Sequence, residues 1–284
     1  MVRTGFDDGF GDESPPPSVR MGFPVLTPAV KRLMLLNAGV FLVCFLAFFF
    51  WEAGYVWILH TLGLDPQSWR ENAPLVPLWQ LVSYGFLHSV RDPSHILFNM
   101  LTLYFFGVML EREIGARRFV LTYLAAQVLG GVFFLVLALA TGSEIPLIGA
   151  SGACFGVMVA AATLWPRAQV LFIFIPLTLR TLALIFVGIE FYLFLMAFKG
   201  APSDGVSHVT HLGGIVYGFV AVRTGLIRWD PVRAWGERRS AKAVESAAAD
   251  EQRMDQLLEK IHKQGMSSLT SGEREFLKRV SSRR

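Results

Sequence analysis

Six apolar runs, separated by charged or proline-containing connections, are the feature that most constrains the fold of this chain. A helix of about 20 apolar residues is long enough to cross the hydrocarbon core of a bilayer. Charged residues make up only 17% of the 284 residues and hydrophobic residues 53%, which excludes a soluble domain. We predict an all-α polytopic membrane protein with six spans, at about Leu33 to Trp51, His95 to Leu110, Phe119 to Ala140, Ser151 to Trp165, Thr181 to Phe198 and Val209 to Val222.

Composition divides the chain into three parts. Residues 1–28 are rich in proline, glycine and acidic residues, and we expect a disordered N-terminus on the cytosolic side. Residues 29–228 contain the six spans and form the membrane domain. Residues 229–284 are polar and are predicted to form a separate cytosolic tail that interacts with a cytosolic partner, self-associates, or serves only as a solubilising extension.

The tail has the pattern of a helical hairpin. Apolar residues recur at helical spacing through Leu257 and Ile261, and Gly265 can end that helix. Thr270 and Glu273 then have the spacing of a capping box at the start of a second helix.

Two connections are predicted to lie at the membrane surface. Residues 52–94 interleave tryptophans with charged residues, which favours short helices lying half in the outer leaflet. Residues 168–180 are apolar but contain a proline and an arginine, and we interpret them as an interfacial turn.

Basic residues gather on one side of the predicted topology, and the net charge is +4. The positive-inside rule therefore predicts a cell-membrane protein with both termini in the cytosol and the start of the fourth span near the outer face. Such a distribution favours contact with membrane lipid over nucleic acid. The cytosolic side carries Lys31, Arg32, Arg112, Arg117, Arg118, Arg167, Arg223 and Arg228, and the other side only Arg70, Arg91 and Lys199.

Cys44 and Cys154 both fall inside apolar runs, and we expect them to be reduced core residues. No secretory signal peptide is predicted, because the first apolar run begins after about 30 polar residues. No cofactor is expected.

Ser151 opens the fourth span within the sequence Gly149-Ala150-Ser151-Gly152-Ala153. That span has about 15 residues, or about 22 Å of helix, which is shorter than a hydrocarbon core of about 30 Å. Ser151 is therefore expected below the outer surface, at the floor of a water-filled cavity, because a loop inside a membrane must be buried in protein or line water. The serine is a candidate nucleophile; the alternative is a small-residue packing face.

His211 lies near the start of the sixth span, at a depth comparable with Ser151. Gly214 and Gly218 share its helix face and can approach the glycines of the fourth span closely. An ionisable residue inside a membrane is costly, which favours a functional role. We interpret His211 as the base that activates Ser151; a packing hydrogen bond is the alternative.

His95 and Asn99 are four residues apart in the second span and share one face. Both can donate hydrogen bonds toward an oxyanion near Ser151, together with the Ser151 backbone N–H. The alternative is a polar patch that lines the mouth of the cavity.

No carboxylate is predicted to orient His211, so we expect a Ser–His dyad rather than a triad. Phe155, one turn after the serine, is expected to pack on the imidazole instead. His208 is expected to line the cavity. Glu190 in the fifth span is expected to be protonated and bonded to a neighbour.

Together these segments resemble the rhomboid family of intramembrane serine proteases, of the bacterial type with a cytosolic extension. The resemblance covers residues 30–228 and rests on four motifs in order: Leu78-Trp79-Gln80-Leu81 with Phe86-Leu87-His88, His95-Ile96-Leu97-Phe98-Asn99-Met100, Gly149-Ala150-Ser151-Gly152-Ala153 and His211-Leu212-Gly213-Gly214.

The resemblance implies a six-helix bundle with a membrane-embedded loop between the first two spans, and with the fifth span as a lateral gate. It implies that Ser151 is the nucleophile, that His211 is the base, and that His95 and Asn99 line the oxyanion hole. The substrates implied are transmembrane segments of other proteins, cut near their outer ends at small residues. Gln80, Phe155 and the insertion at residues 91–93 depart from the pattern of some relatives, and the insertion weakens a mouth-lining role for His88.

Two other functions are alternatives to catalysis. A non-catalytic relative that binds membrane helices would be expected to lack Ser151 or His211. A metal site or transporter built on His88, His95, His208 and His211 is disfavoured, because the sequence has no HExxH motif and no carboxylate is predicted to join those histidines.

Overall fold

The structure, a computed structural model, describes residues 24–172, 175–199 and 206–281. Most of the N-terminal segment predicted to be disordered therefore lies outside the described residues. The chain divides into two units, residues 1–224 and 225–284, and each is described by itself below.

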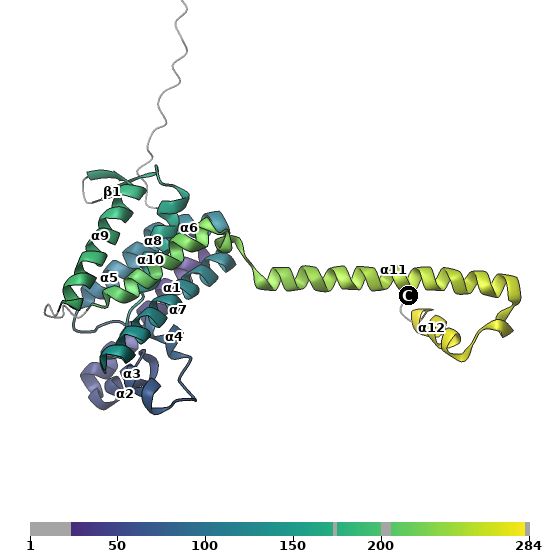
Figure 1. The fold of residues 1–284 in the computed structure, drawn as a ribbon, viewed down its shortest axis with the longest axis horizontal. Helices are drawn as coiled ribbons and strands as arrows, with labels where there is room; N and C mark the ends of the chain where they lie inside the picture. The colour runs from purple at the N-terminus through teal and green to yellow at the C-terminus, as the bar shows by residue number, and fades with distance from the viewer. Residues whose placement is uncertain (1–23, 173–174, 200–205, 282–284) are drawn as a thin grey trace, which may run out of the picture. The chain divides into compact units, whose positions relative to one another are not determined.

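The first unit is a bundle of helices (Figure 1). In chain order it contains α1 Pro28–Phe50, α2 Glu52–Leu62, α3 Pro66–Glu71, α4 Gln80–Ser83, α5 Pro93–Thr102, α6 Val108–Ile114, α7 Ala116–Thr141, α8 Ser151–Leu164, α9 Leu179–Phe198 and α10 His208–Arg223. A single π-helical turn, Leu103–Gly107, joins α5 to α6, so that residues 93–114 form one continuous helix. The prediction of an all-α polytopic membrane protein is confirmed.

Four helices in the described residues are long and apolar enough to cross a membrane: Pro28–Phe50, Pro93–Ile114, Ala116–Thr141 and Leu179–Phe198. The other two predicted spans are shorter, since α8 has 14 residues and α10 has 16. The count of six spans therefore stays a prediction.

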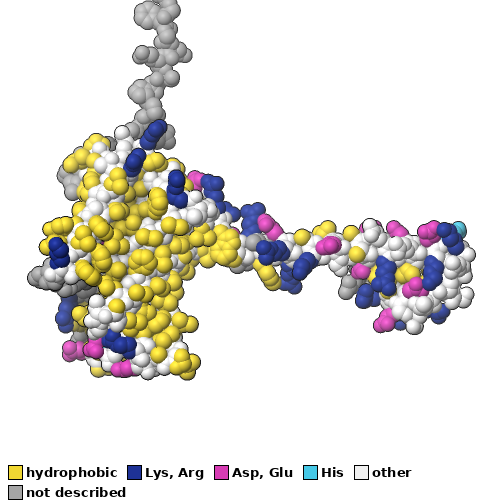
Figure 2. Space-filling model, viewed as in Figure 1, with side chains coloured by type: hydrophobic (Ala, Val, Ile, Leu, Met, Phe, Trp, Pro, Cys, Tyr) yellow, Lys and Arg dark blue, Asp and Glu magenta, His cyan; other side chains and the backbone are white. Residues whose placement is uncertain are grey.

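The side chains of the bundle are arranged for a lipid solvent. Hydrophobic side chains cover much of the face of the bundle shown in Figure 2. Many large apolar residues of the bundle are more than half exposed, among them Leu35, Phe49, Phe98, Val136 and Phe191. In water such a surface would be an aggregation site, whereas in a bilayer it is solvated.

Helix α8 occupies the centre of the bundle, packed against α7 and α10. Ala153, Val157, Ala160 and Ala161 along it are completely buried. Its small side chains allow neighbouring backbones to approach closely, which is how helices associate where lipid supplies no hydrophobic driving force.

The closest approach joins α8 to α10 through glycines. A Cβ built on Gly214 would lie 1.9 Å from the carbonyl oxygen of Gly152, and one built on Gly218 would lie 2.1 Å from that of Gly156. Neither distance is sterically possible, so glycine is required at both positions of α10. The predicted matching of the two glycine pairs is confirmed.

The segment between α1 and α5 contains short helices, as predicted: α2, α3 and α4, followed by a 3-10 turn at Tyr84–Phe86. Gln80 at the start of α4 holds them together: its Oε1 accepts from the Asp65 backbone N–H and the Trp69 indole, both at 3.1 Å, and its Nε2 donates to the His60 carbonyl at 2.9 Å. The depth of these helices in the outer leaflet stays a prediction.

Residues 168–180 were wrongly interpreted as a turn. They contain two antiparallel strands, β1 Gln169–Phe172 and β2 Ile175–Thr178, with Leu171 opposite Pro176. A proline cannot donate to a ladder but is tolerated in an edge strand, and both strands of a two-stranded sheet are edges. The apolar, partly β-branched composition of this stretch favours strands.

A buried carboxylate fixes the start of α1. Glu111 of α6 accepts hydrogen bonds from the backbone N–H groups of Ala29 at 3.0 Å and Val30 at 2.9 Å, and from the Thr27 hydroxyl. These N–H groups have no acceptor within their own helix, and a negative charge is favourable at a helix N-terminus. Glu111 thereby joins the first two spans.

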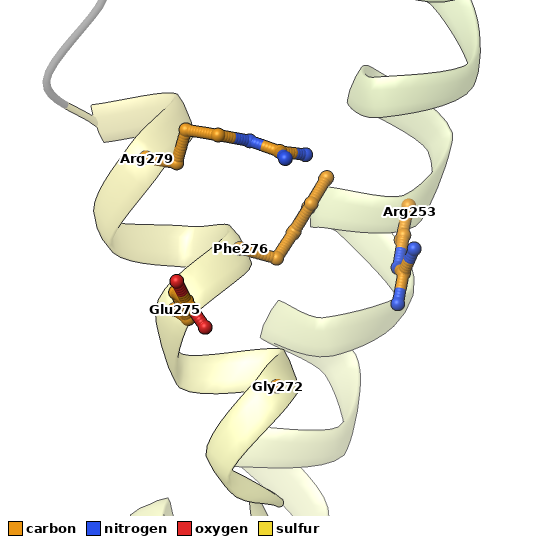
Figure 3. Close-up of a pocket in the computed structure, with 5 residues that line it drawn as sticks. All are labelled: Arg253, Gly272, Glu275, Phe276 and Arg279. Carbon is orange, nitrogen blue, oxygen red and sulfur yellow. The ribbon is translucent and has the colours of Figure 1, made fainter.

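The second unit contains α11 Pro231–Gln264 and α12 Ser271–Ser281. Leu257, Leu269 and Phe276 form a small core between the two helices. Figure 3 shows Phe276 between them, with the guanidinium carbons of Arg253 and Arg279 at 4.8 and 5.5 Å from its ring centre. The predicted helical hairpin is present.

The capping box at the start of α12 is also present. The Thr270 hydroxyl accepts from the Glu273 N–H at 3.3 Å, and the Glu273 carboxylate accepts from the Thr270 N–H at 2.8 Å. The Thr270 N–H, and then Lys260 at 2.9 Å, lower the pKa of Glu273 to about 2.

The close contact of α8 and α10 can be tested by adding one methyl group. We expect Gly214→Ala to destabilise the protein by about 3 kcal/mol, because the new Cβ collides with the Gly152 backbone. Gly188→Ala in α9 is the control; nothing lies within 4 Å of its Cβ, so it should not lower stability. The readout is the thermal unfolding temperature in detergent, and equal temperatures for the two variants would contradict the packing described.

The capping box gives a second prediction. Thr270→Ala should cost about 1 kcal/mol and speed amide hydrogen exchange in α12 about fivefold, whereas Ser267→Ala should leave it unchanged. Equal exchange rates in the two variants would refute the cap.

The same carboxylate makes the stability of the hairpin depend on pH. Because the pKa of Glu273 is lower in the folded hairpin than its ordinary value of 4.5, the stability it contributes is present above pH 4.5 and is lost as the pH falls toward 2.

Candidate active site

Ser151 is the first residue of α8 and is half-buried. The loop before it is anchored from two sides: Leu147 pairs with Leu64 through backbone hydrogen bonds of 2.9 and 3.0 Å, and the Gly149 N–H donates to the Tyr84 carbonyl at 2.9 Å. Gly149 has φ of 119°, which L side chains rarely adopt. These contacts fix where the serine enters the helix.

His211 lies in the first turn of α10 and is buried. Its Nε2 is 2.7 Å from the Ser151 Oγ, which is hydrogen-bond distance. The two residues are 60 positions apart in sequence and are brought together by the glycine contacts between α8 and α10. The predicted juxtaposition of the serine and the histidine is present.

The ring of Phe155 stacks on the imidazole of His211. The two ring centres are 4.6 Å apart and the planes are inclined by 27°. Phe155 is one helical turn after Ser151, as the sequence indicated. Its ring restricts rotation of the imidazole on the face that it covers.

The prediction that no carboxylate reaches His211 is wrong. Oε2 of Glu190, in the middle of α9, lies 2.7 Å from the His211 Nδ1. Glu190 was recognised in the sequence only as an intramembrane carboxylate with an unnamed partner. The position of a residue within a span gives its depth but not the direction it faces, so nothing in the spacing of Glu190 and His211 indicated the contact.

His208 was predicted to line the cavity, and that role stays a prediction. The residue is buried, and its Nδ1 lies 2.7 Å from the same Glu190 oxygen. His208 and His211 are three residues apart, so both point from one face of α10 toward α9.

His95 and Asn99 lie on α5 as predicted. In the structure His95 contacts Gly149 and Asn99 contacts His88, and their oxyanion role stays a prediction. A Cβ on Gly149 would lie 2.5 Å from the His95 Nε2, so this ring packs directly on the backbone two residues before Ser151. Asn99 is buried, and its Nδ2 lies 3.1 Å from the His88 Nε2. Since an amide nitrogen carries two hydrogens, this contact uses one of the two donors of Asn99.

His88 is therefore part of the site's surroundings, although the sequence had made its role less secure. His88 lies in the loop before α5 and is buried, and its ring centre is 5.0 Å from that of His95. Burial, and then the neighbouring His95, lower the pKa of His88 to about 3. At neutral pH it is an uncharged acceptor for the Asn99 amide.

Glu190, His208 and His211 form the group in the described residues whose side chains suit a metal ion, since one atom of each lies within 4.8 Å of the others. Two histidines and one carboxylate are a ligand set that zinc accepts. Ligands at zinc–nitrogen distances of about 2.0–2.1 Å in a tetrahedron are about 3.3 Å apart. The 2.7 Å separations observed are instead those of hydrogen bonds.

The arrangement provides a serine hydroxyl next to an imidazole nitrogen that can accept its proton, at the N-terminus of a helix. The first backbone N–H groups of α8 have no acceptor within the helix and form the positive end of its dipole. This combination suits attack on a carbonyl carbon and stabilisation of the resulting oxyanion.

Two stretches of the chain match known families. The family model of the Rhomboid domain matches residues 77–228, which is more than half of the chain and includes Ser151, Glu190 and His211. Residues 244–283 match a family of unknown function, DUF6576.

The sequence is also similar to several curated proteins that carry rhomboid names. The chain is 28% identical over 219 residues to RHOMBOID-like protein 12, mitochondrial, of Arabidopsis thaliana, over 70% of this chain and 60% of that protein. It is 31% identical over 146 residues to Rhomboid protease GluP of Bacillus subtilis (strain 168), over 50% and 25%. It is 29% identical over 154 residues to Presenilin-associated rhomboid-like protein, mitochondrial, of Homo sapiens, over 51% and 39%. The chain thus spans less than two thirds of each relative.

The environment of His88 predicts a pH dependence of stability. The unfolded chain binds a proton at His88 below about pH 6.5, whereas the folded chain does so only near pH 3, so the free energy of unfolding should fall as the pH is lowered between these values. We expect a shallower fall in His88→Gln, whose side chain can still accept from Asn99. The unfolding temperature in detergent from pH 7 to pH 4 measures this, and parallel curves for both proteins would contradict the buried, neutral imidazole.

Proposed function

Because this chain belongs to the rhomboid family, we propose that it is an active intramembrane serine endopeptidase that hydrolyses peptide bonds in or near transmembrane segments of other proteins. The observation that carries the proposal is the 2.7 Å contact between the Ser151 Oγ and the His211 Nε2 at the start of α8. Family membership alone gives the fold, and a non-catalytic member would not need a base at this distance from a serine.

In the first half of the reaction, the Ser151 Oγ attacks the carbonyl carbon of the substrate while its proton moves to the His211 Nε2. The carbonyl oxygen becomes an oxyanion. The C–N bond then breaks, and the leaving amine takes the proton from Nε2. An ester between Ser151 and the N-terminal part of the substrate remains.

In the second half, water attacks the ester carbon and gives its proton to the His211 Nε2. The C–O bond to Ser151 breaks, the Ser151 oxygen takes the proton back, and a carboxylic acid product leaves. Each half passes through an oxyanion, which the Ser151 backbone N–H and the side chains of His95 and Asn99 stabilise in this proposal.

A transmembrane substrate fits the surroundings of the site. Backbone groups of a membrane helix are satisfied within the helix, and each group left unpaired in lipid costs about several kcal/mol. A carbonyl becomes open to attack only where a helical turn unwinds. The water-filled cavity predicted at Ser151 would lower that cost and supply the hydrolytic water, and helix-destabilising residues in the substrate would lower it further.

The protein is a multi-pass membrane protein, and we propose that both termini lie on the side rich in arginine and lysine. In this proposal the membrane is a bacterial inner membrane, and the side rich in arginine and lysine is its cytosolic side. In this topology the start of α8 faces the outer half of the bilayer, and residues 229–284 form a cytosolic tail, available to a cytosolic partner or to a second copy of the chain. Residues 29–228 form the protease domain.

The proposal predicts the outcome of removing either member of the dyad. Ser151→Ala should abolish cleavage of a model single-span substrate in liposomes, and His211→Ala should lower it by about 10³-fold or more, because the hydroxyl then has no base. Product formation is measured by the appearance of the two fragments on gels.

Ser143→Ala, in the loop before α8, and His262→Ala, in the tail, are matched controls that should cleave at the wild-type rate. Cleavage by Ser151→Ala equal to that of the wild type would refute the proposal. A wild-type protein that captures the substrate without cutting it would support a non-catalytic helix-binding protein instead.

A further inference from the structure

We propose that Glu190 is a positioning residue for the reaction, which makes the site a Glu–His–Ser chain rather than a dyad. The proposal rests on the function proposed above. It starts from three groups on three helices: Glu190 on α9, His211 on α10 and Ser151 on α8. The two contacts that join them are 2.7 Å each, and they use opposite nitrogens of the His211 ring.

The direction of the hydrogen bonds follows from what each group can donate. Glu190 was expected to be protonated, but its Oε2 lies 2.7 Å from two imidazole nitrogens, and we take it as ionised, so that this oxygen accepts from both. An ionised carboxylate oxygen only accepts, so the bond to Glu190 places the His211 proton on Nδ1. The Nε2 of the neutral ring then carries a lone pair, which accepts from the Ser151 hydroxyl. A neutral imidazole with its proton on Nε2 could not take the serine proton, so this tautomer is the one that catalysis needs.

His208 has a separate part in this arrangement. Its Nδ1 donates to the same Oε2 of Glu190, and an oxygen with two lone pairs can accept both bonds. Two donors from the first turn of α10 hold the carboxylate more tightly than one. His208 therefore orients Glu190, and Glu190 orients His211, while Phe155 covers the ring of His211.

The location of Glu190 adds an electrostatic role. When His211 takes the proton from Ser151, the imidazole becomes positive inside a buried site, where a charge without a partner is costly. A carboxylate at 2.7 Å from Nδ1 stabilises that cation. The proton on Nδ1 stays on the ring throughout, so no proton is transferred to Glu190.

The rival interpretation is structural. The hydrogen bonds of Glu190 also connect α9 to α10. A polar contact between membrane helices can serve packing alone, stabilising the bundle as other interhelical hydrogen bonds do. The two interpretations differ in the state of the His211 ring. A tether requires only that α9 stay in place, whereas a positioning residue requires the proton on Nδ1.

The experiment compares the full-length wild type with Glu190→Gln and Glu190→Asp in liposomes. We expect Glu190→Gln to lower kcat about 10²- to 10³-fold with KM within about twofold, because a glutamine amide can donate to Nδ1 and select the wrong tautomer. Glu190→Asp keeps the charge and should recover at least about tenfold over Glu190→Gln. Glu144→Gln, an exposed carboxylate in the loop before α8, is the control and should leave both constants unchanged.

The second readout is the ¹⁵N spectrum of labelled histidine, assigned with His211→Ala. It should report Nδ1–H for His211 in the wild type and loss of that state in Glu190→Gln. This readout does not need activity, so it decides the role of Glu190 even where the wild type cleaves nothing, an outcome that would refute the proposed function alone.

Three results would overturn the proposal: a kcat of Glu190→Gln within twofold of the wild type in a protein whose Ser151→Ala variant is inactive, an unchanged His211 tautomer in Glu190→Gln, or activity that is lost with a chelator and restored by zinc. The last result would mean that Glu190, His208 and His211 hold a metal ion. The first two would leave Glu190 as a tether between α9 and α10.

Discussion

The close approach of α8 and α10 is the constraint on which the candidate site depends. Gly152 and Gly214 bring the two backbones together where any side chain would collide, and Ser151 and His211 lie beside these glycines in their own helices. The 2.7 Å contact between serine and histidine therefore follows from helix packing rather than from a flexible loop. A site on packed helices holds its geometry more precisely than one on loops.

A buried polar group without a partner is costly in a bundle that is solvated by lipid, and the buried carboxylates Glu111 and Glu190 both have hydrogen-bond partners. Glu111 accepts from the free N–H groups at the start of α1, and Glu190 accepts from two imidazoles of α10. The first carboxylate satisfies backbone donors, and its role is structural. The second contacts the ring that touches Ser151, which places it where it can affect chemistry.

Much of this arrangement could be predicted because it follows from periodicity and composition. Apolar runs indicated the long helices, and the i, i+3 and i+7 spacing of His211, Gly214 and Gly218 indicated a shared face. The stacking of Phe155 on His211 could be predicted because Phe155 lies one helical turn after Ser151. These features depend on residues close in sequence or on one helix.

What could not be predicted depends on how helices rotate against each other. Glu190 is 21 residues before His211, and the direction in which it faces is set by the packing of α9, to which sequence spacing gives no access. The contact between the Asn99 amide and His88 was not predicted, because His88 lies in a preceding loop; the oxyanion role of Asn99 stays a prediction. The strands β1 and β2 were missed because a proline was taken as a break rather than as an edge-strand residue.

The most direct measurement of the central claim, that Ser151 is a nucleophile activated by His211, is covalent labelling with a fluorophosphonate followed by mass spectrometry. We expect one adduct per chain, on the peptide that contains Ser151, formed much more slowly in His211→Ala. No adduct on the folded wild-type protein, or an adduct on any other serine, would contradict it.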